Sequence, residues 1–120
     1  MSALLTEIVI ESSDPESSAA FWSGALGWEL RRYMPGNLPW ISASGDPAEH
    51  DLKLVFVGAQ PGKAPGSRLY LNPVGCDLTE EIGRLSSLGA TEVAGGSKTP
   101  WVALVDPGGT GLTVLPQRID

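Results

Sequence analysis

The chain has 120 residues, enough for one domain with a buried core, and 42% of them are hydrophobic, as in an ordinary globular protein. Acidic residues outnumber basic ones by 14 to 8 and no cluster of Lys or Arg could follow a phosphate backbone, so nucleic acid is not an expected partner. The single cysteine, Cys76, excludes an internal disulfide, and no apolar run approaches the roughly 18 residues of a membrane span. We therefore expect a cytoplasmic protein without membrane contact.

The first half of the chain has the pattern of one strand, one helix and three more strands. Residues 4–11 alternate apolar and polar side chains, which predicts a strand. Asp14 and Pro15 suit the N-cap and first position of a helix that should stop near Gly27. Residues 28–33, 39–44 and 51–57 are predicted strands, separated by turn-rich segments.

The second half repeats this pattern after a linker rich in Gly and Pro, residues 59–67. Strands are predicted at 68–72, 91–93, 100–105 and 111–115, and a helix at 76–89. Tyr70 and Asp77 follow Glu7 and Asp14 at the same offset of 63 residues. We therefore predict a βαβββ unit written twice, with module one at residues 1–58 and module two at residues 68–120 of a single domain.

Alternation along the predicted strands indicates which side chains face away from the helices. Leu69 and Leu71 belong to the helix side, which leaves Tyr70 on the opposite face, where its counterpart Glu7 also lies. Trp101 alternates in the same way with apolar residues assigned to the helix side, and aromatic walls suit a flat ligand. The predicted lining of a cleft comprises Glu7, Trp40, Ser42, Arg68, Tyr70, Asn72, Trp101 and Thr113.

The segments "SDPESSAAFWSGALGWEL", "LGATEV" and "WVALVDPGGTGLTVL" resemble the glyoxalase-like branch of the vicinal oxygen chelate superfamily, which includes bleomycin-resistance proteins. The similarity covers nearly the whole chain in the right order. It implies an α+β fold in which two βαβββ modules form a curved eight-stranded mixed sheet around a cleft, the glyoxalase/bleomycin resistance/dioxygenase fold. It also implies a homodimer.

The resemblance further implies where metal-dependent members carry their ligands, commonly two His and a Glu. These positions fall on Glu7, Tyr70 and Gly111, with a possible fourth near Val57. A neutral phenol must lose a proton with a pKa of about 10 before it binds metal well, and glycine offers no side chain. We therefore expect no cofactor, and a divalent metal is disfavoured.

Glu7 has two interpretations that the sequence leaves open. It could act as a general acid or base together with Tyr70. Alternatively, it could pair with Arg68 and accept a hydrogen bond from Tyr70, which would stabilise the sheet. The only histidine, His50, lies in a turn-like segment, where it and its acidic neighbours could form at most an adventitious cation site; these neighbours are Asp46, Glu49 and Asp51.

Three hypotheses about function follow. The leading one is a domain without the family's metal site that binds a small organic molecule, aromatic or cationic, since the net charge of -6 is compatible with a basic ligand. The second is a lyase, isomerase or dioxygenase that uses Glu7 with a metal, or Glu7 and Tyr70 as acid and base. The third is a dimeric scaffold domain that binds no ligand.

Overall fold

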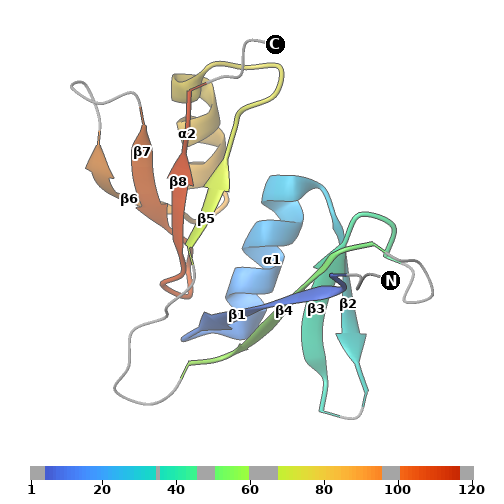
Figure 1. Ribbon diagram of the computed structural model, residues 1–120. Coiled ribbons are helices and arrows are strands. Elements are labelled where there is room, and N and C mark those ends of the chain that lie inside the picture. Colours follow the sequence, from blue (N-terminus) through green and yellow to red (C-terminus); the bar gives the residue numbers. More distant parts are fainter. Residues whose placement is uncertain (1–4, 35, 46–50, 60–67, 96–100, 117–120) are drawn as a thin grey trace.

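The computed structural model describes residues 5–34, 36–45, 51–59, 68–95 and 101–116, and this part of the chain forms two helices and eight strands (Figure 1). In chain order the elements are β1 (Glu7–Ser12), α1 (Pro15–Leu26), β2 (Glu29–Tyr33), β3 (Leu38–Ser42), β4 (Lys53–Gly58), β5 (Arg68–Leu71), α2 (Leu78–Ser87), β6 (Thr91–Gly95), β7 (Val102–Val105) and β8 (Gly111–Val114). The order βαβββ therefore occurs twice, as the sequence repeat predicts.

The strands are divided between two four-stranded sheets, with the orders β1-β4-β3-β2 and β5-β8-β7-β6. In each sheet the first strand of the module is parallel to the last one, whereas the other neighbours are antiparallel. Both sheets are thus mixed, and the predicted α+β fold class is confirmed. Strands β1 and β5 each lie at an edge of their own sheet.

Both helices begin at an aspartate, as predicted. The Asp14 carboxylate accepts the backbone N–H of Ser17 at 3.2 Å, and the Asp77 carboxylate accepts that of Glu80 at 2.8 Å. Gly27, with φ of 70°, ends α1 in the left-handed conformation that favours glycine. Neither of these described helices is long and apolar enough to cross a membrane.

One hydrophobic core receives side chains from both modules. It contains Ile10 and Phe56 of the first sheet, Leu104 and Leu112 of the second, and Trp22 of α1. Each large side chain buried in this way contributes roughly 1.5–3 kcal/mol. One face of β1 and one face of β8 therefore contribute to the core, and each sheet turns its other face away from this shared core.

The turn between β7 and β8 attaches the second sheet to α1. Asp106 is 3% exposed, and its carboxylate accepts the indole N–H of Trp22 at 2.9 Å and the backbone N–H groups of Gly108 and Thr110 at 2.8 and 2.9 Å. The Thr110 hydroxyl donates to the carbonyl of Glu11 at 2.9 Å. A β-carbon on Gly108 would collide with two serine hydroxyls of the first module. Close approach of the modules therefore requires glycine there.

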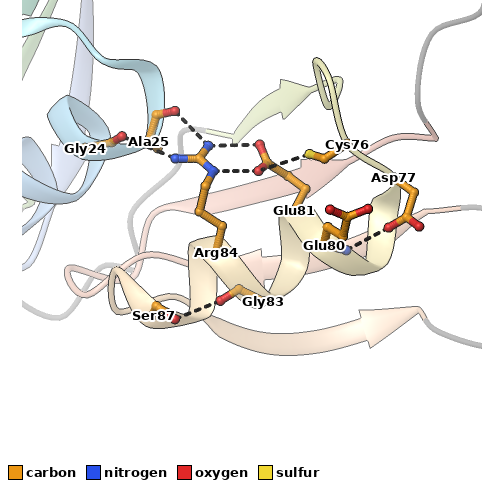
Figure 2. A network of polar contacts seen from close by, with 9 residues as sticks. All are labelled: Gly24, Ala25, Cys76, Asp77, Glu80, Glu81, Gly83, Arg84 and Ser87. Carbon is orange, nitrogen blue, oxygen red and sulfur yellow. Dashed lines mark hydrogen bonds and ion pairs between the residues drawn. The ribbon is translucent and has the colours of Figure 1, made fainter.

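A second polar junction joins α2 to the C-terminal end of α1 (Figure 2). The buried Glu81 carboxylate accepts two hydrogen bonds from the Arg84 guanidinium, at 2.7 and 2.9 Å. The same guanidinium donates to the carbonyls of Ala25 at 2.9 Å and Gly24 at 3.4 Å. A cation at a helix C-terminus is favourable because the free carbonyls carry partial negative charge. This junction holds the two helices together.

Candidate functional site

A pocket of about 230 Å³ opens on the second sheet, on the face turned away from the core. It is lined by Tyr70 of β5, Thr113 of β8, and Trp101 and Leu115, which flank β7 and β8. Tyr70 and Thr113 are register partners of parallel strands, and Tyr70 is 63% exposed. Three residues of the predicted cleft lining are thus brought together here: Tyr70, Trp101 and Thr113.

The outward face of the first sheet carries a separate cluster. The Tyr33 hydroxyl donates to the Glu7 carboxylate at 2.7 Å, and the Tyr33 ring stacks on Trp40 with 5.4 Å between ring centroids and 29° between planes. The Lys53 ammonium lies 5.5 Å from the centroid of the Trp40 ring, within cation–π range. We call these four residues the Trp40 cluster.

Two members of the Trp40 cluster, Lys53 and Tyr33, were not predicted from the sequence. Lys53 is the register partner of Glu7, and the alternation of β4 places it on the same face as Val55, so this signal was present in the sequence. Tyr33 reaches Glu7 although β2 and β1 are at opposite edges of the sheet, because the sheet curls. No pattern along the chain indicates the degree of that curl.

The Tyr33 phenol has a perturbed acidity. Burial, the hydrogen bond to Glu7 and the negative charge of Glu7, in that order, raise its pKa to about 12. The phenol is therefore protonated at neutral pH and serves as a hydrogen-bond donor to Glu7. It is not available as a general base.

The remaining predicted lining residues lie elsewhere. Ser42 is fully buried, and its hydroxyl accepts the backbone N–H of Gly45 at 3.0 Å. The Asn72 side chain donates to the carbonyl of Pro116 at 3.1 Å and lines a different cavity. Arg68 begins β5, but its side chain is outside the described part of the structure.

Glu7 and Tyr70 occupy different sheets. The lining of the Tyr70 pocket includes no residue of the first sheet, and the phenol that donates to Glu7 is that of Tyr33. Within the described residues, therefore, the structure brings Glu7 together with Tyr33, Trp40 and Lys53, and brings Tyr70 together with Trp101 and Thr113. A direct contact between Glu7 and Tyr70 is not among these arrangements.

The positions that the resemblance assigns to metal ligands carry few donor atoms. Glu7 offers a carboxylate, whereas Tyr70 lies on the other sheet, Gly111 has no side chain and Val57 has no side-chain donor atom. Among the described residues, no group of three or more His, Cys, Asp or Glu side chains is placed to hold a metal ion. A divalent cation needs several such donors at once.

The acidic segment around His50 is described only in part. His50, Asp46 and Glu49 lie outside the described residues. Asp51 is described, and its carboxylate accepts the backbone N–H of Ser44 at 2.7 Å. Hydrogen bonding from the Ser44 side chain, followed by that from its backbone, lowers the pKa of Asp51. The cation site considered for this segment stays a prediction.

A larger cavity of about 470 Å³ lies beside the Arg84–Glu81 junction, next to the end of α1. Cys76 is among its lining residues (Figure 2). Burial, followed by the charge of Glu81, raises the pKa of the Cys76 thiol. Because the thiolate is the reactive form, this cysteine is not activated as a nucleophile.

Comparison with known proteins identifies the family of this chain. The model of the family described as glyoxalase-like domain matches residues 7–115. Similar solved structures include Leishmania major glyoxalase I (TM-score 0.65, 15% identity, covering 95% of this chain and 86% of that one) and the oxidase ChaP-H2 (0.65, 18%, 99% and 96%). Another is an antibiotic binding protein from Streptomyces sp. CB03234 (0.59, 21%, 98% and 98%). A search of curated proteins gave no match.

Proposed function

Because the chain belongs to the glyoxalase-like domain family of the vicinal oxygen chelate superfamily, we propose that it binds a small organic molecule with a flat ring on the outward faces of its sheets. The observation that carries this proposal is the pocket formed by Tyr70, Trp101 and Thr113. Two aromatic walls with one hydroxyl are typical of a site that stacks a planar ligand and orients it by a hydrogen bond. A fold neighbour that is an antibiotic binding protein gives this function a precedent.

The proposed site works without the family's metal ion. The support is the donor set, since Gly111 and Val57 offer no ligand atom and the Glu7 carboxylate already accepts a phenol. Elemental analysis of the purified protein should find far less than one divalent metal per chain, and Glu7→Gln should not change the amount. Stoichiometric metal that disappears in Glu7→Gln would contradict this part of the proposal.

The site is proposed to be completed in a homodimer. The Tyr70 pocket is smaller than the roughly 300 Å³ at which ligand pockets begin. Exposed apolar side chains lie in and beside the edge strands β1 and β5, namely Leu5, Val9 and Tyr70 at 67%, 54% and 63% exposure. A second copy that covers these edges would also deepen the pocket. Light scattering coupled to size-exclusion chromatography should give twice the chain mass of 12.6 kDa.

An enzymatic role is the alternative. The exposed Glu7 carboxylate beside a protonated phenol would be the acid–base group, with Tyr70 supplied across the completed cleft. Product analysis after prolonged incubation with any bound compound separates the two roles. Recovery of the unchanged compound supports binding alone, whereas a product lost in Glu7→Gln supports catalysis.

Equilibrium dialysis against a panel of flat aromatic compounds tests the binding proposal directly. Tyr70→Ala and Trp101→Ala each remove a wall of the pocket and should weaken binding about tenfold, since a lost aromatic contact costs roughly 1 kcal/mol or more. Val74→Ala is the matched control, because Val74 is 91% exposed and outside this pocket. Equal affinities in all four proteins would refute the assignment of the site.

A further inference from the structure

Two hydrogen-bond donors of the Trp40 cluster have no acceptor within the part of the chain that the structure describes. Trp40 is 2% exposed, and its indole N–H is buried without a hydrogen-bond partner among the described residues. Buried polar groups are nearly always paired, and an unpaired donor is costly. Trp22 shows the usual arrangement in this same protein, because its indole N–H donates to Asp106 at 2.9 Å.

Lys53 is the second such donor. It is 7% exposed, and lysine is rarely so buried unless it is paired with a carboxylate. Within the described part of the chain, its ammonium makes no ion pair or hydrogen bond; it lies over the Trp40 ring and interacts at longer range with the charge of the Asp51 carboxylate. An ammonium has three N–H donors, and an aromatic face compensates them only in part.

Both donors belong to one place on the outward face of the first sheet, since the ammonium lies against the ring that carries the unpaired N–H. The neighbouring carboxylate of Glu7 accepts the Tyr33 hydroxyl, and within the described residues no hydrogen bond or ion pair joins it to Lys53 or Trp40. Among the described residues, the site thus holds one positive charge and one neutral donor without a hydrogen-bond acceptor, with the carboxylates of Glu7 and Asp51 nearby. An anionic oxygen would satisfy both of them.

Building on the proposed function, we propose that the ligand carries an anionic oxygen, such as a carboxylate, which binds between the Lys53 ammonium and the Trp40 indole N–H. Charge-assisted hydrogen bonds of this kind are about twice as strong as neutral ones. The net charge of -6 would favour a cationic ligand, whereas the ligand proposed here is anionic. Local donors determine the preference because exposed charges farther away than about 8–10 Å are screened by salt.

Tyr33 lies against this site. Its ring stacks on Trp40, its hydroxyl donates to Glu7, and it ends β2, which is an edge strand. Met34, the next residue, is 76% exposed, so the chain beyond Tyr33 is not packed into the core. In the proposed complex, the Tyr33 side chain swings away and the anionic oxygen of the ligand reaches the Trp40 N–H.

The test uses naphthoate and its neutral analogue naphthamide as probes, with Kd measured by titration calorimetry. The wild type should bind naphthoate at least about tenfold more tightly than naphthamide. Lys53→Met should abolish this preference, and Lys53→Arg should restore most of it. Trp40→Phe should reduce it. Arg32→Met removes the same charge from the opposite face of the same sheet, where the guanidinium contacts Glu16, and should leave the preference unchanged.

The outcomes separate this inference from the proposed function. If the wild type binds both probes equally and Lys53→Met has no effect, anion recognition is refuted while small-molecule binding stands. If neither probe binds, and no other flat aromatic acid or amide does, both are refuted. An equal loss of preference in Arg32→Met would assign the effect to general charge and overturn the role of Lys53. Circular dichroism and urea denaturation of each variant identify any that fails to fold, and the Lys53→Arg comparison then decides.

Discussion

Trp22 and Trp40 are both buried, but within the described residues only the indole N–H of Trp22 has a hydrogen-bond partner. Replacing either by phenylalanine removes the same volume from the interior. Trp22→Phe also breaks a bond to a buried carboxylate, whereas Trp40→Phe removes a donor for which the described residues supply no acceptor. The difference between the two substitutions therefore isolates the hydrogen bond.

We expect Trp22→Phe to lower the free energy of unfolding by about 2 kcal/mol more than Trp40→Phe does, because hydrogen bonds to charged groups contribute roughly 1.5–3 kcal/mol. Urea denaturation monitored by circular dichroism measures both values. Equal losses in the two variants would show that the Trp40 N–H has an acceptor after all. That result would remove the basis for reading Trp40 as a ligand donor.

The acidity of Tyr33 reports on its contact with Glu7. In a Tyr70→Phe background Tyr33 is the only tyrosine, and its pKa of about 12 should fall when Glu7→Gln removes the neighbouring charge. The phenolate absorbance, followed against pH, measures it. An unchanged titration would mean that burial alone, the largest cause, controls the phenol.

The raised pKa of Tyr33 also predicts the direction of a stability change. Below the ordinary tyrosine pKa of about 10 the phenol is neutral in both the folded and the unfolded chain. Between about 10 and 12 the unfolded chain ionises first, so the contribution of Tyr33 to folding is lost as pH rises through this window.

Site residues were predictable from the sequence only where they alternate within one strand. Tyr70, Thr113 and Trp101 follow from strand periodicity and gather in one pocket. The partner of Glu7 does not follow, because Tyr33 is 26 residues away and reaches it across a curled sheet. Likewise, the burial of Ser42 depends on the turn that contains Gly45, which strand alternation does not describe.

At the scale of elements, local signals account for the helices. The N-cap Asp14 satisfies free N–H groups of the first turn, so Asp14→Ala should lower the free energy of unfolding and Asp14→Ser should lower it much less. The Ser17 hydroxyl and backbone N–H bind the carboxylate and lower the pKa of Asp14. The benefit is therefore present above the ordinary pKa of aspartate and is lost as pH falls through the lowered one.

Urea denaturation at neutral and at acidic pH measures this effect. The gap between the wild type and Asp14→Ala should be widest at neutral pH and should narrow in acid. A gap that does not change with pH would show that the charge on Asp14 is irrelevant to the cap. The similarly placed Asp77 provides the comparison in α2.

The turn between β7 and β8 can be predicted from the local sequence only in part. Its conformation is predictable, because "DPGG" is typical of a tight turn. The sequence does not indicate that Asp106 accepts the indole of Trp22, 84 residues earlier, or that Gly108 lies against the first module. Those contacts depend on how the two modules pack.

For the whole molecule, the repeat in the sequence predicts the order of elements in both modules, and the structure confirms it. The repeat does not predict how the two sheets are joined. That depends on side chains far apart in the chain, such as Arg84 with the carbonyls of α1. As a result, each sheet presents its own outward face, one with the Trp40 cluster and one with the Tyr70 pocket.

The most direct measurement is a nuclear magnetic resonance titration of isotope-labelled protein with naphthoate, observing the indole N–H signals of its 4 tryptophans. We predict that the signals of Trp40 and Trp101 shift with ligand concentration. The signal of Trp22 should stay fixed, because its N–H is bound to Asp106 in the core. A saturating titration in which Trp40 and Trp101 do not move, or in which Trp22 alone moves, would contradict binding on the outward faces of the sheets.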